Sequence, residues 1–455
     1  MAFRSDRTEE PRGRGPAPRI ILVLALAALL LRNVPLCWLM PLWSFGDEMG
    51  HLDCAMKWGR GHIPQGTDRL EPVLFELYRA RTDHRYDSAV PGPPIVSVDQ
   101  MALGGYTYES KHPPLPYWIM ALFLKLFKAL GISLFVQVKL FRMLSLAAVA
   151  GGIVTLYHGL RRNPRLGTMF YAPLLFIGLL AQDMYFSINT DTFAFLCCSG
   201  ALVGMMDVLR TPRSRRGWAL LTGATVLMMW AKAINAVIFA LWGVLAAVLL
   251  RKGLDRRVIR LLVASLLIGI ALSAPFYIYN QVRFGNPFQY DYSSLFGPNP
   301  YPPAGLSPHT AFVFLQAYTR TLFRGEMVWN GSYFDVLPGA KGVYPLTWLP
   351  ALAFFLGLAQ GAVRKSDPEQ PFRSFFLVSG ILIPAGLAFG YFFIGRVPYY
   401  QLRLSLPMIY PVLFVFGLGW TAILRREDLS LAVPSVLLLA YNAAHTFIML
   451  GKVLA

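Results

Sequence analysis

Long apolar runs separated by short polar breaks dominate this sequence. A run of roughly 17 to 25 apolar residues can cross a bilayer as a helix. Eleven runs approach or reach this length, so the pattern predicts an all-α polytopic membrane protein. The predicted spans are 20–42, 137–160, 169–183, 191–209, 218–232, 235–250, 258–279, 344–363, 374–394, 403–424 and 430–450.

One further apolar segment, 113–130, is assigned by the charges that follow it. If it crossed the membrane, the Arg-rich breaks at 161–165, 210–216 and 251–260 would lie outside, against the positive-inside rule. If it lies along the outer interface, all three breaks face the cytoplasm. Its opening prolines and late lysines also suit an interfacial helix. We therefore expect eleven spans, a cytoplasmic N-terminus and an outside C-terminus.

Composition supports the membrane interpretation. Only 15% of the 455 residues are charged, and the mean hydropathy is +0.48, whereas soluble proteins carry about 25% charged residues. The net charge of +18 comes from short Arg-rich breaks rather than from a continuous basic stripe. This arrangement reflects membrane topology, and we expect no nucleic-acid partner. The four cysteines form neither a disulfide framework nor a zinc pattern.

The predicted spans divide the chain into three parts. Residues 1–19 form a basic cytoplasmic N-terminus, 20–425 the main transmembrane domain, and 426–455 a final transmembrane helix. Two long loops, 43–136 and 280–343, lie outside, and loops of this length are usually functional or disordered. Their aromatic residues favour order at headgroup level, with short helices near 309–323. The Arg-rich loops favour a bacterial inner membrane.

Asp47 and Glu48 directly follow the first span. Carboxylates near hydrocarbon are costly, which favours a functional role. Partial burial raises the pKa of a carboxyl group and suits it to general-base catalysis. The simpler alternative is that Asp47 only caps a helix running through Leu52.

Cationic side chains recur on the same predicted side of the membrane. Lys111 and His112 precede a proline-rich helix start, which restricts where they point. Lys232 lies between two apolar runs, and Arg396 and Arg403 lie near the tenth span. Arginine binds phosphate through paired hydrogen bonds, and the orientation rule disfavours arginines outside. The simpler alternative for each cation is contact with lipid headgroups.

Two further motifs have local explanations. Asp191 ends the segment Asn189-Thr190-Asp191 at the start of the fourth span, where a helix N-cap accounts for part of the pattern. Gly285 in Gly285-Asn286-Pro287 permits a positive φ and predicts a turn after Tyr279-Asn280. We expect this second motif to be architectural.

The order of these motifs resembles the GT-C superfamily of membrane glycosyltransferases. Within it, the chain is most similar to the bacterial aminoarabinose and protein-mannosyl transferase branch. The resemblance covers about 20–425 and departs from the branch at Leu404, where relatives often have Tyr. It is carried by Asp47-Glu48, Lys111-His112-Pro113-Pro114-Leu115, Arg142, Ser187-Ile188-Asn189-Thr190-Asp191, Tyr279-Asn280 with Gly285-Asn286-Pro287, and Gln401-Leu402-Arg403.

The resemblance implies transfer of a sugar from a polyprenyl-phosphate donor to a lipid, glycan or protein acceptor at the extracytoplasmic face. Asp47 would act as the base, and Glu48 would orient the acceptor or bind a divalent metal. An inverting displacement would need no second carboxylate as nucleophile. The residues implied in binding the donor are Lys111, His112, Asp191, Lys232, Arg396 and Arg403.

Two other functions fit the same composition. A polytopic transporter or flippase would place ionisable groups near mid-membrane, where Asp207 and His445 are candidates. A non-catalytic protein that binds polyprenyl lipid would keep the motifs without turnover. The sequence identifies neither the sugar nor a metal requirement.

Overall fold

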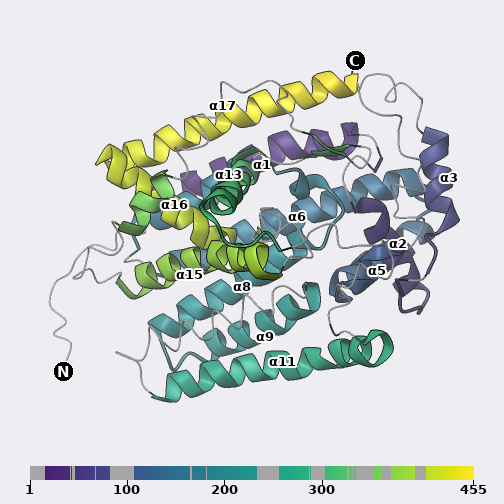
Figure 1. Ribbon diagram of the computed structural model, residues 1–455, viewed down its shortest axis with the longest axis horizontal. Coiled ribbons are helices and arrows are strands. Elements are labelled where there is room, and N and C mark those ends of the chain that lie inside the picture. The colour runs from purple at the N-terminus through teal and green to yellow at the C-terminus, as the bar shows by residue number, and fades with distance from the viewer. Residues whose placement is uncertain are drawn as a thin grey trace.

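Helices form nearly all the regular structure of this protein in the computed structural model (Figure 1). This confirms the predicted all-helical, polytopic fold class, apart from one small hairpin. The structure describes residues 16–40, 42–43, 47–66, 68–81, 107–163, 166–180, 182–232, 256–285, 287, 303–324, 327–329, 332–334, 352–359, 370–394 and 406–454.

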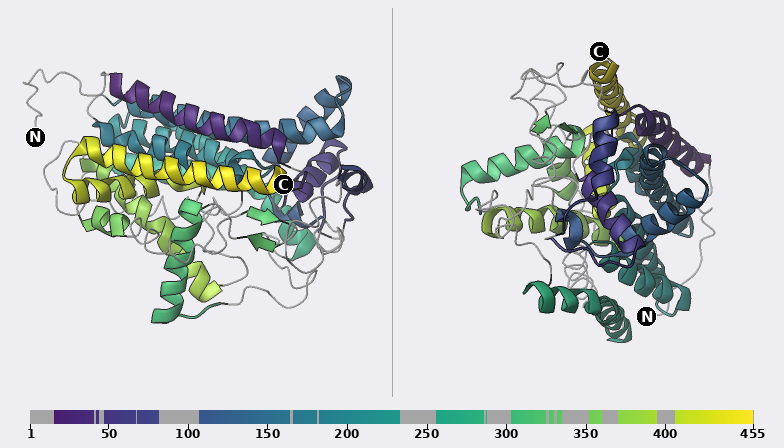
Figure 2. Two further views of the ribbon diagram at one scale, coloured as in Figure 1. Left: turned by 90° about the horizontal axis from the view of Figure 1, so that it is seen from above. Right: turned by 90° about the vertical axis from the view of Figure 1, so that its right-hand side faces the viewer.

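Seven of the described helices are long and apolar enough to cross a membrane. In Figure 2, the first and last of them run lengthwise beside one another on one side of the bundle. The seven are α1 (Pro16–Leu39), α6 (Leu134–Arg161), α8 (Asp191–Arg210), α11 (Arg256–Phe284), α15 (Gln370–Phe389) continued by η8 (Gly390–Ile394), α16 (Ile409–Leu424) and α17 (Glu427–Leu454).

The predicted span at 169–183 is not one continuous helix. It comprises η5 (Thr168–Phe170), α7 (Ala172–Leu179) and η6 (Asp183–Phe186), and the chain becomes extended at Leu180, with φ −64° and ψ 133°. Polar Gln182 is buried directly after this break. The segment is apolar and buried, but its helix ends at Leu179, before Gln182.

Three other predicted spans have different outcomes. The span at 218–232 is the continuous helix α9 (Arg215–Ala231) of 17 residues. The span at 235–250 lies outside the described residues, and of 344–363 only 352–359 is described, as helix. The total of eleven spans therefore stays a prediction.

Short helices gather at one end of the bundle, here called the α2–α5 end (Figure 1). They are α2 (Glu48–Gly59), α3 (Pro72–Arg81), η4 (Tyr108–Lys111) and α5 (Leu115–Ala129). One face of α5 buries Tyr117 and Met120, whereas Trp118, Leu122 and Leu126, spaced four residues apart, expose apolar side chains. An apolar face exposed on a short helix suits the interfacial position predicted for 113–130.

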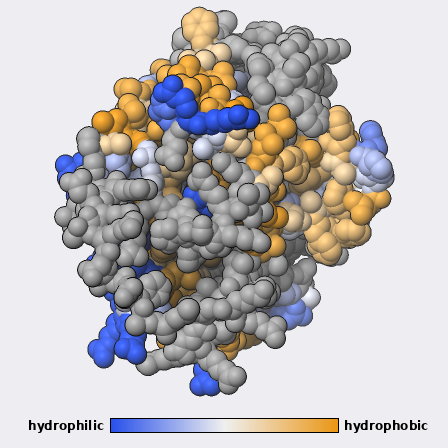
Figure 3. Space-filling model, turned by 90° about the vertical axis from the view of Figure 1, so that its left-hand side faces the viewer, coloured by the Kyte–Doolittle hydropathy of each residue, from blue (hydrophilic) through white to orange (hydrophobic). Residues whose placement is uncertain are grey.

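The opposite end, here called the basic end, gathers the arginines at the ends of α6 and α8. Arg162 Nη1 lies 2.9 Å from Asp207 Oδ2, and Arg210 donates a hydrogen bond to the carbonyl of Arg162. Ser214 caps the next helix by accepting a 3.0 Å hydrogen bond from the Gly217 N–H. Figure 3 views this end and shows hydrophilic side chains bordered by apolar flanks. The breaks at 161–165 and 210–216 therefore share one end, as predicted.

The bundle core is packed by aromatic rings and by close helix approaches, one of which joins α1 to α7. Phe414 lies between Phe170 and Phe376, with ring centroids 4.9 Å and 5.4 Å away. At Gly178, an added Cβ would lie 2.2 Å from the carbonyl oxygen of Ala25. Small residues of this kind let membrane helices pack backbone to backbone. Thus α1 and α7 pack backbone to backbone at Gly178.

The second long loop contains the helix predicted near 309–323, observed as α13 (Pro308–Arg324). In Figure 2 it lies crosswise to the long helices. Strands β1 (Met327–Trp329) and β2 (Ser332–Phe334) pair antiparallel and are the exception to the helical fold among the described residues.

The turn predicted at the start of this loop is also present. Gly285 has φ 70°, and Asn280 Nδ2 donates a 3.1 Å hydrogen bond to the carbonyl of Pro287. Helix α11 extends through Asn280 to Phe284, so the loop begins later than expected. The motif therefore ends helix α11 and has the architectural role expected of it.

The two ends of the bundle give a direct test of topology. Arg60 at the α2–α5 end and Arg213 at the basic end are both exposed. A cysteine replacing Arg60 should react with a membrane-impermeant thiol reagent added outside intact cells, and one replacing Arg213 should react only after lysis. The native chain is the control for background labelling, because Cys37, Cys54 and Cys198 are buried and Cys197 is partly buried within α8. The reverse labelling pattern would contradict the predicted orientation.

Candidate functional site

A fully buried ion pair joins α2 to the transmembrane helix α6. Arg142 Nε and Nη2 donate to Glu48 Oε1 and Oε2 at 2.8 and 2.7 Å, and both side chains are 0% exposed. Two parallel charge-assisted bonds of this kind fix the orientation of both groups. The first turn of α2 is therefore held against the membrane domain.

The same pair collects two other parts of the chain. Arg142 Nη1 donates a 2.8 Å hydrogen bond to the carbonyl of Met40, just after α1, and Lys139 donates to the same carbonyl. Glu48 Oε1 also accepts a 3.1 Å hydrogen bond from the N–H of Ile188. The carboxylate of Glu48 therefore lies where α1, α2, α6 and the segment before α8 meet.

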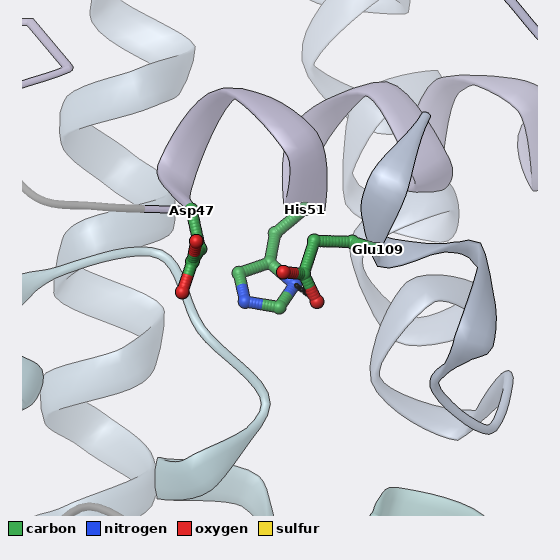
Figure 4. Close-up of side chains that lie close together, drawn as sticks. All are labelled: Asp47, His51 and Glu109. Carbon is green, nitrogen blue, oxygen red and sulfur yellow. Dashed lines mark ion pairs between the residues drawn. The ribbon is translucent and has the colours of Figure 1, made fainter. Parts of the chain in front are cut away.

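Next to this pair, Asp47, His51 and Glu109 form an acidic and imidazole cluster. One ligand atom from each of the three lies within 4.8 Å of the other two. Figure 4 shows Asp47 and His51 on the first turn of α2, with Glu109 facing them from η4. His51 and Glu109 are buried, and Asp47 is partly exposed. The carboxylate of Asp47 is thus the most accessible group of the cluster.

The backbone of Asp47 adopts an unusual conformation. Its φ is 75° and its ψ is −12°, in the left-handed region. A non-glycine residue there costs on the order of 1–3 kcal/mol unless local interactions compensate, although Asp tolerates it better than most. Asp47 occupies the N-cap position of α2, but its side chain makes no capping hydrogen bond. Helix capping therefore does not explain the carboxylate.

Glu109 and His51 each contact one further aromatic side chain, His112 and Tyr117 respectively. The distance between His112 Nε2 and Glu109 Oε2 is 2.7 Å, and that between His51 Nδ1 and Tyr117 Oη is 3.0 Å. The two imidazole centroids lie 5.8 Å apart. The Glu109 carboxylate thus lies between two imidazoles, because its Oε2 is also 3.8 Å from His51 Nδ1.

A second buried network fixes η4 in front of α2. Asp53 Oδ2 accepts hydrogen bonds of 2.6 Å from Lys57 Nζ and 2.8 Å from Thr107 Oγ1, and Asp53 Oδ1 accepts one of 2.9 Å from the Glu71 N–H. Burial raises the pKa of the Asp53 carboxyl above its ordinary value, and these donors offset only part of that rise. Because Thr107 immediately precedes η4, the network sets the position of Glu109.

A second ion pair, Asp191 with Lys232, joins the start of α8 to the end of α9. Both side chains are buried, and Lys232 lies at the C-cap of α9. Asn189 closes the turn before α8 by accepting a 3.0 Å hydrogen bond from the Thr192 N–H. Asp191 lies three residues after Ile188, which bonds Glu48, so this pair lies beside the first.

Aromatic contacts connect this ion pair to α5. Trp230 of α9 lies 5.1 Å from Trp118 of α5, measured between ring centroids. Trp118 in turn contacts Trp58 of α2 edge-on at 5.7 Å. Three tryptophans thus connect α2, α5 and α9 at the α2–α5 end.

The structure brings together five of the eight residues predicted to form the site. They are Asp47, Glu48, His112, Asp191 and Lys232. The backbone of Lys111 lies in η4, but its side chain, Arg396 and Arg403 lie outside the described residues.

Three residues of the cluster were not predicted as site residues. His51 follows Asp47 by four residues and Glu109 precedes His112 by three, spacings that place side chains on one helix face. These spacings are visible in the sequence. No sequence signal, however, indicates that Tyr117 bonds His51.

The cluster has the donor types that a divalent cation uses. Asp47, His51 and Glu109 offer two carboxylates and an imidazole. A cation held by three protein ligands keeps coordination positions open for substrate. Glu48, predicted to orient the acceptor or bind a metal, is instead paired with Arg142.

Comparison with known proteins gives only distant likeness. No protein-family model matches the chain, and no curated protein matches it in sequence. Two solved structures of ArnT from Cupriavidus metallidurans, in the apo state and bound to undecaprenyl phosphate, each show 13% identity and a TM-score of 0.37. Each alignment covers 89% of this chain and 76% of ArnT.

Breaking the buried pair should destabilise the protein strongly. Arg142→Met leaves an uncompensated carboxylate and should lower the free energy of unfolding by about 3–5 kcal/mol. The double variant Glu48→Gln/Arg142→Met should recover much of this loss, since Gln still accepts the hydrogen bond from Ile188. Heat unfolding in detergent measures the stability of the single and the double variant. Arg426→Met is the control, because the ion pair of Arg426 with Asp428 is exposed. A double variant no more stable than Arg142→Met would contradict the explanation.

Cation binding can be tested on the fold itself. Mn²⁺ or Zn²⁺ should raise the unfolding midpoint of the native protein, because a ligand that binds only the folded state stabilises it. His51→Ala should remove that rise, and His62→Ala should keep it, because His62 is an exposed imidazole paired with Asp68. An equal rise in both variants would place the cation elsewhere.

Proposed function

We propose that this protein is a membrane glycosyltransferase that moves a sugar from a polyprenyl-phosphate donor to an acceptor at the extracytoplasmic face. One observation carries the proposal: a partly exposed, strained Asp47 lies beside two buried ion pairs at a single end of a membrane bundle. Charged groups near hydrocarbon are costly and usually functional. The order of motifs and their resemblance to the GT-C superfamily support the same reaction class.

Asp47 is the proposed general base. Its carboxylate faces His51 and Glu109, and its strained backbone conformation is of a kind that is found at active sites. Glu48 positions it through the bonds to Arg142 and Ile188. We therefore assign Glu48 a positioning role in place of the acceptor-orienting or metal-binding role implied by the resemblance.

Lys232 is the proposed contact for the phosphate of the donor. It lies at the C-cap of α9 and is held by Asp191. Cations stabilise the charge that develops on a phosphate leaving group. His112, next to Glu109, is a second candidate, and Lys111, Arg396 and Arg403 complete the proposed donor site.

The proposed step is a single inverting displacement. The acceptor oxygen attacks the anomeric carbon while Asp47 accepts its proton. The bond between that carbon and the phosphate oxygen breaks, and the polyprenyl phosphate leaves with the bonding electrons. A divalent cation bound by Asp47, His51 and Glu109 would supply electrostatic stabilisation at the same place.

The decisive variant is Asp47→Asn, which removes the base while keeping size and polarity. We expect sugar transfer to fall by at least about 100-fold, the contribution typical of general-base catalysis. Purified protein, radiolabelled polyprenyl-phosphate sugars and a membrane-extract acceptor pool give the measurement. Undecaprenyl phosphate is the lipid for a parallel binding assay, which should be nearly unchanged.

Asp68→Asn is the matched control, because Asp68 is an acid of the same region that bonds His62 and the Gln65 N–H instead. It should transfer sugar at the native rate. Equal transfer by Asp47→Asn and the native protein would exclude Asp47 as the base. No transfer by the native protein with any donor, with lipid binding retained, would favour a lipid-binding or transport function.

A further inference from the structure

A buried polar cluster within the bundle lies outside the site described above. Arg32 of α1 is 8% exposed, and its guanidinium donates to Asn33 Oδ1 at 2.8 Å and to Thr446 Oγ1 at 2.9 Å. Its Nη2 also lies 3.2 Å from His445 Nδ1. His445 is fully buried. A guanidinium at this position is expensive in a membrane, so its retention requires an explanation.

The same face of α17 supports the broken segment between α7 and α8. Asn442 Nδ2 donates a 2.9 Å hydrogen bond to the carbonyl of Leu179, the last residue of α7. A helix that ends in an apolar interior leaves carbonyls that need donors. The side chain of another helix therefore provides the cap for α7.

Arg32 holds the other side of this break. Its Cζ lies 5.4 Å above the ring of Phe186, the last residue of η6. A guanidinium over an aromatic face is attracted to it, more strongly where water is excluded. Leu179 and Phe186 therefore have partners in the polar cluster on either side of the break.

The segment that follows carries two contacts of the candidate site. The N–H of Ile188 donates to Glu48, and Asp191 pairs with Lys232. Only one residue, Ser187, separates Phe186 from Ile188. A shift of η6 would therefore move the site contacts directly.

We propose that Asn442, His445 and Thr446 of α17 are positioning residues that place Ile188 and Asp191 for donor binding. Asn442 acts through Leu179, whereas His445 and Thr446 act through Arg32 and Phe186. The donor-binding part rests on the proposed function. The final helix α17 then contributes to donor binding and is not only an additional membrane anchor. Because these residues place contacts for the donor, their loss should weaken donor binding and raise its KM rather than change kcat.

The test compares three α17 variants of the full-length purified protein. Asn442→Leu removes the cap of α7, and Thr446→Val removes one acceptor of Arg32 with little change in shape. Ser435→Ala is the matched control, because Ser435 bonds only the Leu431 carbonyl of its own helix. Hydrogen–deuterium exchange at 184–191 reports positioning independently of catalysis. In both test variants, exchange there should rise roughly tenfold, with α6 and the control unchanged.

Kinetics then separate positioning from simple destabilisation. The KM for the polyprenyl-phosphate sugar should rise roughly tenfold in both test variants, while kcat and the acceptor KM stay near native. Unchanged exchange at 184–191, or a rise spread evenly over α6 as well in both variants, would overturn the inference. A local rise in exchange, with no transfer by the native protein, would retain the positioning role and reject the proposed function.

Discussion

The Glu48–Arg142 ion pair is the interaction on which the candidate site depends. Both charges are withdrawn from water, and this is favourable only where the geometry is good and the remaining hydrogen bonds are satisfied. Here the guanidinium meets the carboxylate with two bonds, and each group has a backbone partner as well. The pair therefore has one low-energy arrangement, and that arrangement fixes where the first turn of α2 begins.

Asp47 gains its position from this constraint. Because Glu48 is anchored, the residue before it must enter the helix from a fixed direction, with a left-handed backbone conformation. That conformation turns the carboxylate toward His51 and Glu109 instead of toward the helix N-terminus. The strain is thus compensated by a buried pair next to it, as expected where a site imposes an unfavourable local conformation.

Several buried polar groups among the described residues are joined in hydrogen-bonded or ion-paired sets. The Asp53–Lys57 network holds η4, Asp191–Lys232 joins α8 to α9, and the Arg32 cluster joins α1 to α17. Each set connects segments far apart in sequence. In an apolar surrounding such sets specify one arrangement of helices, because any other arrangement leaves a donor or charge without a partner.

Much of the architecture follows from local sequence. Apolar runs of the right length predict α1, α6 and α8, and the arginine-rich breaks group at one end as the charge pattern requires. The helix at 113–130 was assigned by charge rather than hydropathy, and α5 exposes the apolar face that this assignment needs. Hydropathy failed at 169–183, where the helix ends at Leu179 and the chain becomes extended at Leu180.

The sequence by itself therefore determined the fold class, the grouping of basic breaks and the candidate acids and cations, because these depend on composition and short-range spacing. Only the tertiary structure decided which of them meet. Sequence spacing could not show that Glu48 would be paired with Arg142, 94 positions later, leaving Asp47 as the accessible acid. Nor could it show that His445, near the C-terminus, would contact Arg32. Which side chains pair across a membrane bundle depends on helix packing and on the free-energy cost of burying an unpaired charge. Neither is a local property of the sequence.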